Sequence, residues 1–338
     1  MKRYIYGLMA LLMLLGVALS SGCINLYMPN GYAGGSSRDN PSNFVVIKDE
    51  SINGDVSKLD LRWIKGKVTF GKSDNNELRI IQKADQSFSE NMVFVHSFNG
   101  DQLVIKDGRY DGSKLISVLA VQRTDIEIYL PERLYDDIRC DSVSSDVIAG
   151  DLTTKAICID ITSGNIDVKG KLGDVSIDTT SGSALAEGEL SSISADSTSG
   201  SITFSSTVAM TNVNANNTSG DIKGSFIHAD EVKIDTTSGN AELTGAIEHF
   251  DYDAISGDLK LSLSVVPNKL FINTISGNSR IYLPRNDGFT ARVDKVSGNF
   301  NSDFPLTVNG DTHVYGNGGA EFNFSMVSGN ISLYETGN

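Results

Sequence analysis

Cysteine and basic residues are both scarce in this chain. Only 3 of its 338 residues are cysteines, too few for the disulfide framework that holds a small secreted domain together, so the fold must rest on packing. Lys and Arg total 28 against 42 Asp and Glu, which gives a formal net charge of -14. So acidic a chain argues against nucleic acid as a partner.

Sequence motifs of enzymes and metal sites are also missing. The 4 histidines form no His-Glu-x-x-His motif and no pair at metal-ligand spacing, and there is no Cys-x-x-Cys. No phosphate-binding loop, nucleophile elbow or dinucleotide fingerprint is present. We therefore expect no catalytic residues, no cofactor and no metal ion. No window shows a sustained apolar stripe with a period of 3.6 residues, so the chain is predicted to be all-β.

The first 22 residues are predicted to be a signal peptide. Lys2 and Arg3 precede an apolar stretch that is too short to span a bilayer, and small residues follow it. Cys23 comes next, in an arrangement that resembles a lipobox, and is therefore the expected lipidation site. The alternative is ordinary signal-peptidase cleavage nearby. Residues 23–43 are too poor in apolar residues to fold alone and are predicted to form a flexible tether, which would place the rest of the chain outside the cytoplasm, anchored to a membrane.

A Ser-Gly pair recurs through the second half of the chain. Successive pairs are 18 to 21 residues apart, except for a final spacing of 31, which predicts an insertion between Pro305 and Gly319. Since glycine supplies a positive φ without a Cβ clash, the glycines are predicted to form corners. These turn glycines are Gly164, Gly182, Gly200, Gly220, Gly239, Gly257, Gly277, Gly298 and Gly329.

Apolar and polar residues alternate on both sides of each Ser-Gly pair, as in Ile157/Ile159 before and Ile166/Val168 after Ser163. A unit of about 20 residues with two short strands cannot bury its own inward row, so it must stack on its neighbours. This predicts a single-stranded β-solenoid over 136–338, with residues from Asn301 onward capping its end. Residues 44–135 are predicted to form a β-rich cap at the other end.

The residue after each Ser-Gly pair is Asp, Asn or Ser, and these side chains are expected to form a stacked ladder. Calcium held between coils is the alternative, but that motif needs a regular aspartate and a shorter period.

Four aspartates stand three residues before their serines and are predicted to share one column: Asp160, Asp178, Asp196 and Asp235. Carboxylates one coil apart could bind a ligand or support carbohydrate cleavage, as in β-helix enzymes. No basic residue accompanies them, and a solvated outward stripe is the simpler interpretation.

The run Ile126 to Pro131, the repeated Thr-Ser-Gly-Asn/Asp coils and the closing stretch Met326 to Leu333 together resemble the adhesin-like family DUF4097. The resemblance implies a right-handed β-helix at a cell envelope and brings no catalytic residues. We therefore expect a non-catalytic envelope lipoprotein that binds a surface polysaccharide or a protein. A regulatory envelope-stress protein with a membrane partner and a carbohydrate-active enzyme are the alternatives.

Overall fold

The computed structural model describes residues 41–110 and 121–337, and nearly all of them lie in β-strands. The chain divides after Glu189 into two compact units, each of which is taken by itself below. The expected signal peptide, the lipidation site Cys23 and most of the expected tether lie outside the described residues. Within the described ranges, no helix is long and apolar enough to cross a membrane.

The N-terminal unit contains two 3-10 turns and strands β1 to β9, with the start of β10. Their bounds are η2 (Pro41–Asn43), β1 (Phe44–Ile52), β2 (Lys58–Lys72), β3 (Leu78–Asp85), η3 (Glu90–Met92), β4 (Val95–Asn99), β5 (Gln102–Lys106), β6 (Thr124–Leu130), β7 (Asp137–Thr153), β8 (Ala156–Ser163), β9 (Ile166–Ser181) and β10 (Ala184–Ser199).

The solenoid begins earlier in the chain than the Ser-Gly pairs predict. Strand β2 pairs in parallel with β7 from Lys58 to Phe70, and Gly66, with a φ of 144°, occupies the corner beside Ser145. The side chains of Leu59, Leu61 and Val68 point inward and are fully buried. The region 44–135 is therefore not only a cap, because it contributes one complete coil.

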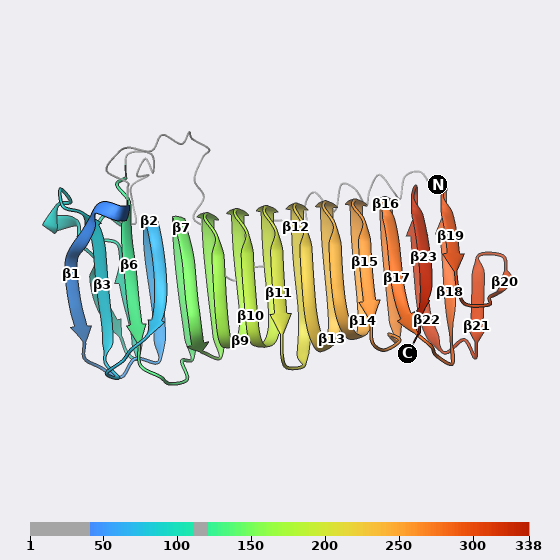
Figure 1. Ribbon diagram of the computed structural model, residues 1–338, viewed down its shortest axis with the longest axis horizontal. Coiled ribbons are helices and arrows are strands. Elements are labelled where there is room, and N and C mark those ends of the chain that lie inside the picture. Colours follow the sequence, from blue (N-terminus) through green and yellow to red (C-terminus); the bar gives the residue numbers. More distant parts are fainter. Residues whose placement is uncertain (1–40, 111–120, 338) are drawn as a thin grey trace. The chain divides into compact units, whose positions relative to one another are not determined.

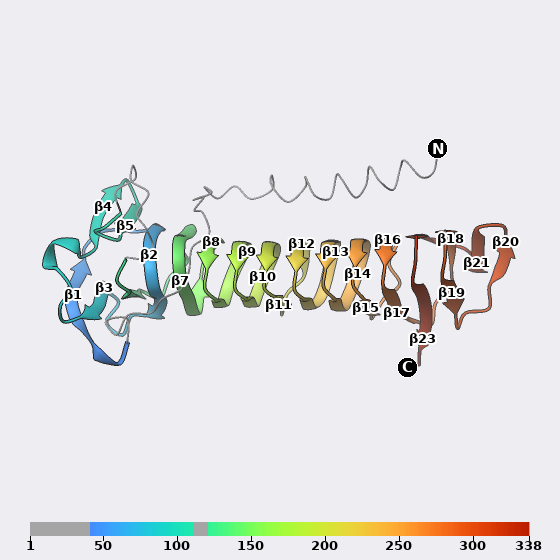
Figure 2. The same ribbon diagram turned by 90° about the horizontal axis from the view of Figure 1, so that it is seen from above.

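Further strands cover the open edge of that first coil. Strand β6 pairs in parallel with the second half of β2, and β3 and then β1 continue the sheet in antiparallel order. On the first half of β2, β5 pairs in parallel and folds back into the hairpin β4–β5 (Figure 2). Paired strands of this kind protect the solenoid's edge from adding another chain.

The C-terminal unit begins at Leu190 and contains the rest of β10 and strands β11 to β23. Their bounds are β11 (Ile202–Ser206), β12 (Met210–Ser219), β13 (Ile222–Ser238), β14 (Ala241–Ser256), β15 (Leu259–Leu263), β16 (Lys269–Ser276), β17 (Asn278–Pro284), β18 (Gly288–Lys295), β19 (Asn299–Ser302), β20 (Thr307–Asn309), β21 (Thr312–Gly316), β22 (Ala320–Met326) and β23 (Asn330–Thr336).

Inward rows of apolar side chains form the core of this unit. Residues four before each serine stack from coil to coil, as Ile234, Tyr252 and Ile272 do in successive parallel strands, and all three are fully buried. The residues three and five after each serine, such as Leu259 and Leu261, are equally buried. The predicted all-β solenoid is confirmed, and its handedness stays a prediction.

The last coil of the chain lies inside the stack instead of at its end. Strand β22 pairs in parallel with β16 on one side and with β18 on the other, and β23 likewise lies between β17 and β19 (Figure 1). The expectation that residues from Asn301 onward cap the solenoid is therefore wrong for 320–336.

The predicted insertion makes this arrangement possible. It forms the hairpin β20–β21, and β21 pairs antiparallel with the edge of β18 that β22 leaves open. The chain thus covers the free edge of β18 with this hairpin. Strands β22 and β23 then return between the earlier strands, β22 between β16 and β18 and β23 between β17 and β19. Phe289 of β18 packs against Phe304, which directly precedes the insertion, and against Tyr315 within it, with ring centroids 5.4 and 5.5 Å apart.

Candidate functional site

The nine glycines of the Ser-Gly pairs form one stacked row of corners in each unit. Their φ angles lie between 103° and 153°. The stacking is also sterically tight, because a Cβ on Gly257 would lie 1.9 Å from the carbonyl oxygen of Gly239 in the preceding coil. The backbone conformation at the corners therefore requires glycine, and the close stacking leaves no room for a ligand between successive corners.

A ladder of Asp and Asn side chains runs beside the corners. In the C-terminal unit the backbone nitrogen of Asn240 donates to Oδ1 of Asp221 at 3.0 Å, and that of Asp258 donates to Oδ1 of Asn240 at 3.0 Å. The ladder continues through Asn278, whose Oδ1 accepts from Nδ2 of Asn330 at 2.9 Å. Each side chain thus binds the backbone or side chain of a neighbouring coil, so the ladder is structural.

The column of aspartates is continuous in the N-terminal unit. Asp141 of β7, Asp160 of β8 and Asp178 of β9 are successive register partners. On the other side of Asp141 the register partner is Arg62 of β2, which forms its ion pair with Asp60. Counting back from Ser144 places Asp141 in this column, although the sequence prediction did not include it. Oδ1 of Asp141 and Oδ2 of Asp160 are buried and accept no hydrogen bond.

Burial and mutual repulsion perturb these carboxyl groups. Burial, together with the charges of Asp178 and Asp141, raises the pKa of Asp160 to about 7. Burial and the charge of Asp60 raise the pKa of Asp141 to about 6, although Arg139 and Arg62 oppose the rise. A raised pKa means that the charged forms are disfavoured, as expected where like charges are half-buried in a row.

In the C-terminal unit the column mixes asparagines with carboxylates, and it includes Asp253, the register partner of Asp235. Asn216 stands between Asp196 and Asp235 in the register, and its Nδ2 donates to Oδ1 of Asp196 at 2.6 Å. Asp235 forms an ion pair with Lys233, whose Nζ lies 3.3 Å from Oδ2. These partners offset the charges only in part, because burial still raises the pKa of Asp235, with the charge of Lys233 opposing the rise and that of Asp253 adding to it.

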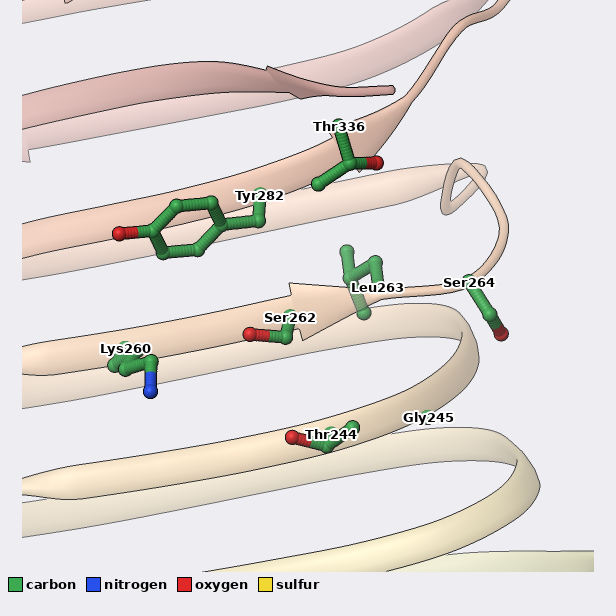
Figure 3. A pocket seen from close by; sticks show the side chains of 8 residues that line it. All are labelled: Thr244, Gly245, Lys260, Ser262, Leu263, Ser264, Tyr282 and Thr336. Carbon is green, nitrogen blue, oxygen red and sulfur yellow. The ribbon is translucent and has the colours of Figure 1, made fainter. Parts of the chain in front are cut away.

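A second candidate site is a groove on the outer face of the C-terminal unit. We name it the tyrosine groove, and it is lined by Thr244, Gly245, Lys260, Ser262, Leu263, Ser264, Tyr282 and Thr336 (Figure 3). Three of these residues, Thr244, Ser262 and Tyr282, belong to one outward row of register partners across the parallel strands β13, β14, β15, β17 and β23. The row reads Ser225, Thr244, Ser262, Tyr282 and Tyr334.

The groove forms where small side chains in this row give way to large ones. The Tyr282 ring stacks on the Tyr334 ring, with centroids 5.0 Å apart and planes 20° apart. Tyr334 therefore supports one side of Tyr282, and the small Ser262 occupies the neighbouring coil on its other side. Nζ of Lys260, at the rim, is held by Oε1 of Glu242 at 2.7 Å. The result is an aromatic wall beside hydroxyl groups.

Sequence reasoning missed this groove for a topological reason. Tyr282 and Tyr334 are 52 residues apart, and sequential stacking of coils would not make them neighbours. They become register partners only because β23 inserts beside β17. Counting forward from Ser276 and Ser328 puts both tyrosines at the same outward position, which is the one sequence feature that connects them.

Comparisons with known proteins agree with the fold. A model of the family described as Toastrack DUF4097 matches residues 56–189 and 171–334. No curated protein matches the chain.

Three solved structures resemble it. A candidate cell adhesion protein from Clostridium sporogenes is 11% identical and has a TM-score of 0.19, over 86% of this chain and 99% of the other. A candidate lipid-binding protein from Parabacteroides distasonis is 12% identical, with a TM-score of 0.30 over 88% and 98%. A candidate adhesin from Bacteroides fragilis is 14% identical, with a TM-score of 0.32 over 65% and 98%. Likenesses of this degree say nothing about function.

Proposed function

The chain belongs to the Toastrack DUF4097 family, and from that premise we propose that it is a non-catalytic, lipid-anchored protein of the cell envelope that binds a surface polysaccharide in the tyrosine groove. The observation that carries the proposal is the supported aromatic wall of Tyr282 next to a row of hydroxyl side chains.

The chemistry of the groove suits a sugar chain. The apolar face of a sugar ring packs on an aromatic ring, and its hydroxyl groups exchange hydrogen bonds with side chains such as Ser262 and Thr244. Because these hydroxyls belong to successive parallel strands, they repeat about every 4.8 Å along the row. A polymer lying along the row would meet the same chemistry repeatedly, whereas a small molecule would use only one position.

Binding is favoured over cleavage by the residues that line the groove. They include no carboxylate and no histidine, whereas hydrolysis of a glycoside needs a pair of acidic residues on either side of the bond. The aspartates of the C-terminal column, Asp196, Asp235 and Asp253, already have Asn216, Lys233 and Asn273 as partners. The groove therefore holds a polymer without a group placed to cut it.

Binding of the purified protein to an array of envelope polysaccharides tests the proposal. We expect saturable binding that leaves the polymer intact. Removing the wall by Tyr282→Ala should weaken binding roughly 10-fold, which corresponds to about 1.4 kcal/mol. Filling the groove by Ser262→Phe should also weaken binding while leaving both tyrosines in place.

The matched control is Phe98→Ala, since Phe98 is an exposed aromatic side chain outside the groove. This variant should bind as the parent does. Equal loss in Phe98→Ala and Tyr282→Ala, or shortened polymer after incubation, would contradict the proposal. Absence of binding to every polymer would point to a protein ligand instead.

A further inference from the structure

A β-bulge between β13 and β14 brings together a histidine and two acidic residues that the groove does not use. The parallel register is regular up to Ser225 and Thr244 and resumes at His228 and Ala246, so Phe226 and Ile227 oppose a single residue. Such bulges re-aim the side chains that follow them. Here the side chain of His228 points toward the next coil.

Three potential metal ligands meet at this bulge. Nε2 of His228 lies 3.0 Å from Oδ1 of Asp230 and 3.8 Å from Oε1 of Glu248. The three ligand atoms all lie within 4.8 Å of one another. A tetrahedral zinc site with bonds of about 2.1 Å places its ligand atoms about 3.4 Å apart. The two spacings from His228, 3.0 and 3.8 Å, lie on either side of that distance, and the third is at most 4.8 Å.

We propose that His228, Asp230 and Glu248 bind a first-row divalent metal ion of the zinc class. One imidazole nitrogen and two carboxylate oxygens form a donor set that such ions accept, whereas calcium and magnesium prefer oxygen donors only. Three protein ligands leave one coordination position of a tetrahedral ion free. That position is open to solvent, because the side chains of Asp230 and Glu248 are about half exposed.

The local charges favour a cation at this place. The carboxylates of Asp230 and Glu248 both lie beside one histidine, so negative charge predominates in the cluster. A divalent ion would offset that excess. This site is independent of the tyrosine groove, and failure of either proposal leaves the other unaffected.

Calorimetric titration of the metal-free full chain with Zn²⁺ tests the site, with Co²⁺ as a spectroscopic probe of coordination. We expect one saturable site, and visible Co²⁺ absorption bands typical of nitrogen and oxygen ligands. His228→Ala should weaken binding roughly 100-fold or more, since even loss of an outer partner of a metal ligand costs 10- to 100-fold. Affinity should also fall at acid pH, because protons compete for the imidazole.

His249→Ala is the matched control, because His249 is an exposed histidine one residue beyond Glu248 and outside the cluster. It should bind Zn²⁺ as the parent does, and Glu231→Gln should as well. Unchanged binding in His228→Ala, or Ca²⁺ binding equal to Zn²⁺ binding, would overturn the proposal and leave only an acidic surface. Thermal melts of each variant establish that a lost signal is not a lost fold.

Discussion

Replacing Gly257 with alanine tests whether the stacked corners need glycine for conformation alone or also for space. The φ of Gly257 is 147°, and its Cβ would lie 1.9 Å from the carbonyl oxygen of Gly239. An L-residue in a left-handed conformation costs roughly 1–2 kcal/mol. Overpacking of a well-packed site costs roughly 1–3 kcal/mol more. We therefore expect Gly257→Ala to lower the free energy of unfolding by roughly 2–5 kcal/mol.

Two other glycines separate the contributions. Gly310, in the turn of the β20–β21 hairpin, has a φ of 61° but nothing within 4 Å of its Cβ position, so Gly310→Ala should cost only the conformational part. Gly150 has neither a positive φ nor a close neighbour, and Gly150→Ala should be neutral or stabilising by about 0.4–1 kcal/mol.

Urea denaturation followed by far-ultraviolet circular dichroism is the suitable assay. The only tryptophan, Trp63, lies in the N-terminal unit, so its fluorescence would not report on Gly257. If the Gly257→Ala and Gly310→Ala proteins lose the same stability, the close approach of the corners has no energetic consequence and the reasoning is wrong.

Two further predictions concern the acidic column and the inserted coil. Because the pKa of Asp160 is raised to about 7 in the folded protein, its contribution to stability is present below its ordinary pKa and is lost as pH rises toward 7. Asp160→Asn should therefore raise the free energy of unfolding at pH 8 and make it fall less steeply between pH 4 and 7. Asp49→Asn should instead lower the free energy of unfolding at pH 8, because a hydrogen bond from Arg79 lowers the pKa of Asp49. Urea midpoints across that range check both, and an unchanged Asp160→Asn profile would contradict the first. Phe324→Ala in β22 should cost about 3–5 kcal/mol and speed hydrogen exchange in β16 and β18 alike, because β22 pairs with both; faster exchange in β16 alone would contradict the inserted order.

Much of the fold follows from the sequence because each coil repeats the same physical constraint. A stacked coil must bury the residues at fixed positions before and after its corner, and the corner itself demands glycine. The coil formed by β2 escaped prediction because Lys65-Gly66 replaces the Ser-Gly pair. Leu59 and Leu61 before it, and Val68 and Phe70 after it, nevertheless keep the same spacing as in the other coils.

The sites depend on information that a repeat does not carry. The metal ligands His228 and Glu248 are 20 residues apart, which is one coil, so no local motif connects them. The bulge that aligns them depends on one extra residue in β13, and that extra residue is visible only against the register of β14.

The order in which the coils stack also depends on information outside the repeat, and it determines whether the tyrosine groove forms. Every coil presents the same backbone edges and the same inward rows, so a coil can pair with any other, and local sequence does not specify which. The hairpin β20–β21 resolves the choice, because it occupies the free edge of β18 and leaves the last coil a place only between β16 and β18. That placement puts Tyr334 behind Tyr282. The insertion that protects the solenoid's edge therefore also creates the aromatic wall of the tyrosine groove, so a shortened hairpin should weaken polysaccharide binding even though it contributes no residue to the groove.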